Sequence, residues 1–258
     1  MIMPVLTGIQ DILCIVSGTV VGFTLGLIGG GGSILAVPLL VYLVGINDPH
    51  IAIGTTAFAV GMTALYSLFH HHRANNVRWA IASRFALVGV IGAFLGSEAG
   101  KAIDGKSLLV LFAVLMIVVA VRMFRGDRDV KAETGSVTYG KVYLYGGVVG
   151  VLAGFFGIGG GFLIVPAIMR SARLPIINAI GTSLVSVAAL GLATALSYAW
   201  SGFVDWKIAA EYLCGGILGG WFGVLAANTL CQKKTLLRRV FSVIVFAVAG
   251  YVLLRQVG

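Results

Sequence analysis

Two glycine-rich passages, about half a chain length apart, carry the residue pattern best suited to chemistry. The first runs from Gly26 to Ser33 and leads to Pro38, and the second runs from Gly154 to Gly161 and leads to Pro166. Glycines let backbone amides come close to a ligand because no side chain intervenes. A helix that begins just after such a run points its unpaired amides and positive dipole end at the same spot, which suits a small anion.

The candidate ligand-binding groups in these passages are the backbone amides of Gly31, Gly32, Ser33, Gly159, Gly160 and Gly161. We predict that helices follow the glycines, over residues 33–43 and 162–169. Each passage interrupts a long apolar run, and unpaired backbone at membrane depth is tolerated only where it is buried in protein or lines a cavity. The alternative is that the glycines only permit close helix packing, which is the interpretation we favour for other glycines such as Gly92 and Gly219.

Small hydroxyl residues form a second duplicated pattern, in the segment that follows each glycine passage. Thr55 and Thr56 form one pair, and Thr182 and Ser183 form the other. Hydroxyls can donate hydrogen bonds to an anion without the desolvation cost of a full charge. They also bond to carbonyls of their own helix, and the pattern does not separate the two roles.

A histidine run, His70 to His72, has no counterpart in the second half, where Ser197, Tyr198 and Ala199 stand. We expect these histidines to face solvent or lipid headgroups, with proton carriage as an open alternative. A metal site would need further ligands at suitable spacing, and none lies nearby, so we predict no metal and no cofactor. There is no nucleophile elbow, P-loop or HExxH motif, which argues against an enzyme.

The elements that must position these residues are hydrophobic helices. The chain has 258 residues, of which 59% are apolar and 10% charged, and its mean hydropathy is +1.03, so we predict an all-α integral membrane protein. Eight hydrophobic segments lie at about residues 10–45, 51–70, 80–100, 107–124, 142–169, 177–200, 207–230 and 236–255. The N-terminus lacks the basic region of a signal peptide, so we expect the first segment to be retained. The basic residues fall between segments without interleaved aromatic residues, so nucleic acid is not an expected partner.

The two passages belong to a duplication of the whole chain. A shift of 128 residues aligns the glycine passages, and a shift of 127 aligns Ala52–Thr55 with Ala179–Thr182. The chain therefore divides into a first membrane repeat (residues 1–125), a polar linker (126–141) and a second membrane repeat (142–258).

The placement of lysine and arginine favours repeats of inverted topology. If each of the eight segments crosses the membrane once, the two sides hold 10 and 8 basic residues, which is almost no bias. If segments 1 and 5 turn back at their glycines, the two sides hold 14 and 4. We therefore predict up to ten membrane elements, with the two broken ones re-entrant or hairpin-like, both termini outside and the linker in the cytoplasm.

The passages GLIGGGGSILAVPLL and GFFGIGGGFLIVPAI, each followed by an AIGT element, resemble the TauE/SafE-type sulfite exporter family of bacterial membrane permeases. The resemblance covers essentially the whole chain. It implies a multi-pass protein of the bacterial inner membrane that moves a small sulfur-containing anion, such as sulfite or an organosulfonate, outward. It also implies that an ion gradient drives transport. Independently of the resemblance, the histidine run makes a proton one candidate for the coupling ion.

Pattern and resemblance together predict a secondary active transporter that works by alternating access around one anion site, framed by both glycine breaks. Its partners would be the small sulfur anion and the lipid bilayer. Two other functions stay open at this point: an anion channel, and a membrane binding or assembly subunit that transports nothing.

Overall fold

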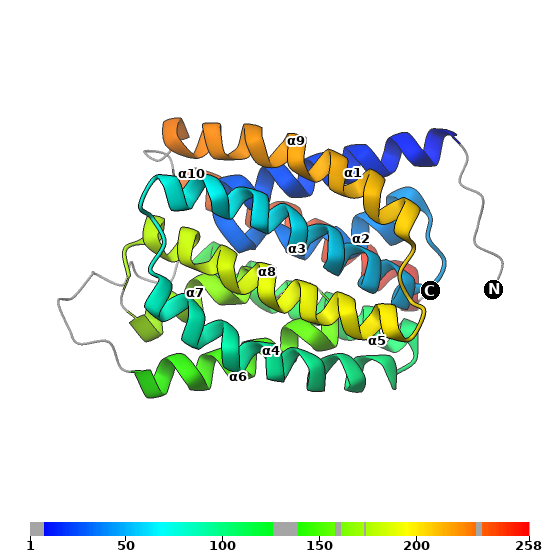
Figure 1. The fold of residues 1–258 in the computed structure, drawn as a ribbon. Helices are drawn as coiled ribbons and strands as arrows, with labels where there is room; N and C mark the ends of the chain where they lie inside the picture. The colour runs from blue at the N-terminus through cyan, green and yellow to red at the C-terminus, as the bar shows by residue number, and fades with distance from the viewer. Residues whose placement is uncertain (1–7, 126–138, 158–160, 173, 231–233, 258) are drawn as a thin grey trace.

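The structure is a computed structural model that describes residues 8–125, 139–157, 161–172, 174–230 and 234–257. Within these ranges every regular element is a helix, which confirms the all-α prediction (Figure 1). Six helices coincide with predicted segments: α3 (Pro49–Arg73), α4 (Trp79–Lys101), α5 (Gly105–Arg125), α8 (Ile176–Trp200), α9 (Trp206–Leu230) and α10 (Lys234–Val257). Among the described residues, seven helices are long and apolar enough to span a membrane.

The first and fifth segments are both broken at glycine, as predicted. α1 (Gly8–Ile28) ends directly before Gly29, whose φ is 74°, and α6 (Tyr139–Phe156) ends directly before Gly157, whose φ is 65°. Such positive φ values favour glycine because a Cβ atom would crowd the backbone. The helix α7 (Gly161–Ala172) follows the second break, as expected, and has 12 residues. It is about 18 Å long, less than the roughly 30 Å hydrocarbon core, so it is too short to cross a membrane.

The chain after the first break differs from the regular helix that we predict over residues 33–43. It forms a 3₁₀ helix, η1 (Gly29–Leu35), a single α-helical turn, α2 (Ala36–Pro38), and a π helix, η2 (Leu39–Val44). Pro38 lies within the α-helical turn, and the equivalent Pro166 lies inside the regular helix α7, so the proline alone does not explain the irregular segment. The first broken element is therefore less regular than the second.

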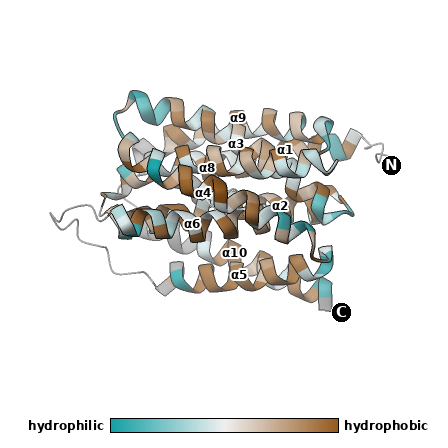
Figure 2. Cartoon of the chain, turned by 60° about the horizontal axis from the view of Figure 1, so that its bottom comes forward, coloured by the Kyte–Doolittle hydropathy of each residue, from teal (hydrophilic) through white to brown (hydrophobic). Residues whose placement is uncertain are grey.

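The helices α3 and α8 form the centre of the bundle and pack on each other. In the apolar window of each, 72% of the residues are buried, against 33% to 50% in the other candidate spans. α1 packs on α9 and α4 packs on α6 (Figure 1), and α5 packs on α10 (Figure 2). Hydrophobic residues dominate the middle of the helices and hydrophilic residues gather at the ends of the bundle, as expected for a membrane-spanning bundle (Figure 2).

Stripes of glycine allow two pairs of helices to touch backbone to backbone. On α1, Gly18, Gly22 and Gly26 face α9, and on α6, Gly146, Gly150 and Gly154 face α4. A methyl group at any of these six positions would overlap the backbone of the facing helix. Gly92 on α4 and Gly219 on α9 make the same close approach from the other side, which confirms the packing interpretation for these glycines.

Equivalent elements of the two halves exchange partners. In the internal duplication, α6 is the equivalent of α1 and α9 is the equivalent of α4. The α1–α9 contact therefore corresponds to the α6–α4 contact. α3 pairs with its own equivalent, α8, and α5 pairs with α10. The equivalent helices α1 and α6 begin at opposite ends of the bundle, and the equivalent loops α3–α4 and α8–α9 also lie at opposite ends (Figure 1).

Candidate functional site

The first glycine of each break packs on the central helix of the other half. A Cβ atom at Gly29 would lie 2.9 Å from Cγ2 of Ile180 on α8, and a Cβ atom at Gly157 would overlap Ile53 on α3. Ile53 and Ile180 are equivalent residues of the duplicated AIGT element. The glycine passage of one half and the AIGT element of the other therefore form one structural unit, which occurs twice. The predicted site does not include these two glycines and two isoleucines. The sequence could have indicated them, because each pair is repeated at the offset of the duplication, 128 residues for the glycines and 127 for the isoleucines.

The predicted amide donors lie at or beside the breaks wherever the structure describes them. Gly31 lies within η1, and Gly32 and Ser33 are buried. A methyl group at Gly32 would overlap the side chain of Thr24, so η1 folds directly onto the end of α1. Gly161 is buried and opens α7, so its amide has no partner within the helix. Gly159 and Gly160 lie outside the described residues.

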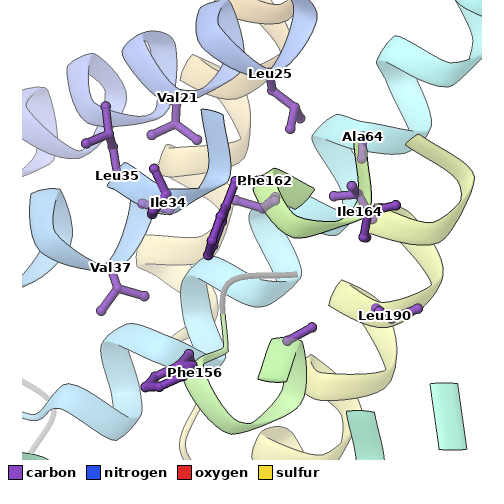
Figure 3. Close-up of a cluster of buried hydrophobic side chains, with 14 of the residues drawn as sticks. Val21, Leu25, Ile34, Leu35, Val37, Ala64, Phe156, Phe162, Ile164 and Leu190 are labelled. Atoms are coloured by element: carbon purple, nitrogen blue, oxygen red, sulfur yellow. The ribbon is translucent and has the colours of Figure 1, made fainter. Parts of the chain in front are cut away.

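The two broken elements meet inside the protein, because η1 packs on α7. Ile34 of η1 and Phe162 of α7 are equivalent residues of the duplication, and they are 0% and 5% exposed. Both belong to the buried apolar cluster shown in Figure 3, together with Val21 and Leu25 of α1. In this conformation, apolar side chains fill the region where the two breaks approach each other.

The hydroxyls of Thr55 and Thr182 connect each central helix to a loop of the opposite half. Oγ1 of Thr55 accepts a 3.0 Å hydrogen bond from the backbone amide of Asp205, just before α9. Oγ1 of Thr182 accepts a 3.0 Å hydrogen bond from the backbone amide of Arg78, just before α4. Both threonines are fully buried. Because each oxygen acts here as an acceptor, each hydroxyl keeps a hydrogen that it can donate.

The neighbouring hydroxyls bond to their own helices. Oγ1 of Thr56 donates to the carbonyl of Ala52 at 2.7 Å, and Oγ of Ser183 donates to the carbonyl of Ile180 at 2.7 Å. This is the intrahelical role that the sequence left open for all four hydroxyls. A ligand would have to displace these bonds before Thr56 or Ser183 could donate to it.

The three histidines do not share one environment. His72 is exposed and its Nδ1 accepts a 3.3 Å hydrogen bond from Trp79, and Nδ1 of His70 lies 3.2 Å from the carbonyl of Tyr66. His71 is 4% exposed, so the predicted solvent-facing position is wrong for this residue. The reason is that α3 continues through Arg73, so successive side chains point in directions about 100° apart. Across the described residues, no group of three His, Cys, Asp or Glu side chains could hold a metal ion.

A charged cluster lies where α4 and α8 end. Nζ of Lys101 donates to Glu98 at 2.6 Å and to the hydroxyl of Ser201 at 2.9 Å, and the hydroxyl of Ser197 donates to Glu98 at 3.0 Å. These residues line an open pocket of about 270 Å³. The carboxylate of Glu98 neutralises the ammonium of Lys101, so this pocket is poorly suited to an anion.

A bundle of membrane-spanning helices with two glycine-broken elements that meet in its interior is typical of membrane transporters. The comparison with known proteins agrees with this class. The chain belongs to the sulfite exporter TauE/SafE family, whose sequence profile matches residues 14–252.

Relatives in several organisms share this class. A "probable membrane transporter protein" of Xylella fastidiosa (strain Temecula1) is 51% identical over 249 residues, which cover 95% of each chain. The "probable membrane transporter protein YdhB" of Bacillus subtilis is 30% identical over 239 residues, which cover 90% of this chain and 96% of the relative. The "probable membrane transporter protein MJ0441" of Methanocaldococcus jannaschii is 29% identical over 191 residues, which cover 72% and 71%. No solved structure matches the chain. The protein is thus a multi-pass membrane transporter.

Proposed function

We propose that the protein is a secondary active transporter, and not an enzyme, that exports a small sulfur-containing anion such as sulfite or an organosulfonate across the bacterial inner membrane. The observation that carries the anion site is the duplicated break, because both glycine passages end a helix inside the protein and η1 packs on α7. The family's description as a sulfite exporter supports sulfur as the chemistry of the substrate.

In this proposal one anion binds between the two breaks. The backbone amides of Gly31, Gly32, Ser33, Gly159, Gly160 and Gly161 would donate to it, together with the hydroxyls of Thr55, Thr56, Thr182 and Ser183. The oxygens of Thr55 and Thr182 accept from the amides of Asp205 and Arg78, in loops at opposite ends of the bundle, so their hydrogens would be offered to the anion at different points of its path. Dispersed partial charges suit an anion that must also leave the site, since no full positive charge holds it.

Alternating access would come from motion of one inverted half against the other. Because α1 packs on α9 and α4 packs on α6, helices of one half contact helices of the other half directly. Opening would separate the apolar contact around Ile34 and Phe162 and expose the amides to one side at a time. The two repeats (residues 1–125 and 142–258) would have inverted topology, with both termini outside and the linker (126–141) in the cytoplasm. A proton is the proposed coupling ion.

Counterflow in liposomes tests this function. Purified protein is reconstituted alone, and exchange of sulfite, thiosulfate, sulfate and sulfoacetate is compared with and without a proton gradient. We expect saturable counterflow of at least one sulfur anion. Flux without saturation or gradient dependence would indicate a channel, and no flux at all would indicate a non-transporting subunit.

Paired substitutions test the site itself. We expect Gly32→Leu combined with Gly160→Leu to abolish counterflow, while Gly8→Leu combined with Gly250→Leu preserves it, because Gly8 and Gly250 have no atom within 4 Å of a built Cβ. Size-exclusion profiles confirm that each variant is still folded. Unchanged anion uptake in the first double variant would contradict the proposed site.

A further inference from the structure

A buried histidine close to the first break has no place in the proposed anion site. His71 lies near the end of α3, it is 4% exposed, and within the described part of the chain neither ring nitrogen has a hydrogen-bond partner. Buried polar side chains are normally hydrogen-bonded, because an unpaired one loses its interaction with water without compensation. An imidazole left in this state calls for a functional explanation.

The imidazole faces the carboxyl end of α1. The carbonyl of Gly26 lies beside the ring, although not in the geometry of a hydrogen bond, and Gly26 is in the last turn of α1 before the break at Gly29. The last carbonyls of a helix carry the negative end of its dipole and attract a cation. Burial acts in the opposite direction, because it penalises a charged group. Two opposed influences of this kind make the charge of His71 sensitive to whether water reaches it.

The surface of α3 that leads to His71 is polar and is covered by glycine. Ser67, one helical turn before His71, is fully buried, and its hydroxyl has no partner among the described residues. Thr63 lies one turn earlier and donates to the carbonyl of Ala59 at 2.7 Å. On α9, Gly216 lies against Thr63 and Gly220 lies near Ser67. Small glycines and hydroxyls therefore form a stripe along which a separation of α3 from α9 would admit water to the imidazole.

Few charged groups act on His71 among the described residues. Of the elements packed on α3, α1 brings the Gly26 carbonyl to His71 and α9 brings glycines to the stripe below it. The ionisable side chain that acts on His71, among the residues the structure describes, is its neighbour His70. Burial and the facing backbone of α1 are thus the main features of the surroundings of His71 among the described residues.

The second half carries tyrosine at the equivalent position. Tyr198, at the end of α8, is fully buried, and its hydroxyl has no partner within the described ranges. Each residue anchors the following loop in the same way: the carbonyl of His71 accepts from the amide of Asn76 at 3.0 Å, and the carbonyl of Tyr198 accepts from that of Phe203 at 2.9 Å. An unperturbed imidazole titrates near pH 6.5, whereas a phenol titrates near pH 10. Of these two equivalent positions, only that of His71 holds a side chain whose unperturbed pKa lies near neutral pH.

We propose that His71 binds and releases the proton that couples anion transport to the proton gradient, one proton per transport cycle. The proton passes from water on one side to the imidazole, and from the imidazole to water on the other side once the protein has changed conformation. This inference rests on the proposed transporter function. Tyr198, at the equivalent position of the second half, is buried in the same way but has an unperturbed pKa far above neutral pH.

The test separates exchange from gradient-driven transport. Four full-length proteins are reconstituted in liposomes: the wild type, His71→Gln, His71→Tyr and His72→Gln. His71→Tyr introduces the residue that the same position holds in the second half, and His72→Gln is the control at an exposed neighbour. Counterflow of labelled sulfite and sulfoacetate is measured without any ion gradient. Accumulation of the same anions is then measured under an imposed pH gradient, with a pH-sensitive dye in the lumen that reports proton movement.

We expect both His71 variants to keep counterflow and to lose gradient-driven accumulation together with anion-dependent proton movement, whereas His72→Gln keeps all three. Accumulation that persists in either His71 variant would overturn the proposal. Loss of counterflow in both His71 variants would also overturn it, because the residue would then be structural. If the wild type shows no counterflow of either anion, the transporter function proposed for these substrates fails first, and the coupling role fails with it.

Discussion

The hydroxyl of Thr55 accepts a 3.0 Å hydrogen bond from the backbone amide of Asp205, although the two residues are 150 positions apart. The equivalent pair in the duplicated chain, Thr182 and Arg78, is joined at the same distance. Each central helix is therefore fastened to a loop of the opposite half by the same bond. The correspondence between the two halves of the duplicated chain therefore extends to single hydrogen bonds.

Replacement of Thr55 by valine should destabilise the protein by about 1 to 3 kcal/mol, because it leaves the amide of Asp205 without its acceptor in a buried position. Asp205 is 8% exposed, so water is poorly placed to substitute. The matched control is Thr56→Val, since the hydroxyl of Thr56 bonds to carbonyls of its own helix and no amide loses a partner. Chemical denaturation in detergent measures the free energy of unfolding. Equal losses in the two variants would argue against the inter-half bond.

Gly157→Ala should lower the melting temperature more than Gly202→Ala. Both glycines have positive φ, 65° and 77°, so both substitutions carry a backbone cost of about 1 to 2 kcal/mol. At Gly157 a Cβ atom would in addition overlap Ile53, whereas Gly202 has open space around it. Adding Ile53→Ala to Gly157→Ala removes that overlap, but it leaves a cavity where the buried side chain of Ile53 was. A Gly157→Ala protein as stable as Gly202→Ala would show that the break does not pack on α3.

Two neighbouring glycines of α6 should respond in opposite ways to alanine. A Cβ atom at Gly150 would overlap the backbone of Gly89 on α4, while one at Gly147 would lie 3.4 Å from Val88, an ordinary contact. Gly150→Ala should therefore separate α4 from α6 and destabilise the protein. Gly147→Ala should be neutral or stabilising by up to about 1 kcal/mol, because alanine favours the helix. Thermal unfolding of the purified variants distinguishes the two, and similar behaviour would contradict the glycine-stripe packing.

Cysteine labelling should place two equivalent turns on opposite sides of the membrane. Asn75 and Gly202 both have positive φ, 56° and 77°, and lie in the loops that Figure 1 shows at opposite ends of the bundle. In a background free of Cys14, Cys214 and Cys231, a membrane-impermeant maleimide should label Gly202→Cys in intact cells. It should label Asn75→Cys only after the membrane is opened, because the basic loop after α3 is the proposed cytoplasmic one. Labelling of both from one side would exclude inverted topology.

Much of the fold could be predicted because a bilayer restricts what a chain can do. A membrane-spanning helix needs about 20 apolar residues and must satisfy its own backbone, so α3 and α8 follow from hydropathy alone. The breaks at Gly29 and Gly157 follow from the glycine runs, since the residue type limits the backbone. The irregular segment around Pro38 was missed, because its glycines and apolar residues allow several helix types and it packs against α1, which the sequence does not reveal.

The candidate site was only partly predictable. The duplicated hydroxyls stand out in the sequence, but Thr55 bonds across to the other half whereas Thr56 bonds within its helix, and a pattern of residue types does not encode that difference. The burial of His71 was likewise hidden in a run of three histidines, because burial depends on which way α3 turns relative to α1.

The sequence by itself determined the helical membrane class, the duplication and the positions of the two breaks, because hydropathy, repeated spacing and glycine content are local properties of the chain. Only the tertiary structure decided which residues meet: that Gly29 rests on Ile180, that Thr55 binds the loop of Asp205, and that His71 faces the end of α1. These contacts join residues far apart in the chain. They exist because the helices of one half bury their faces against helices of the other.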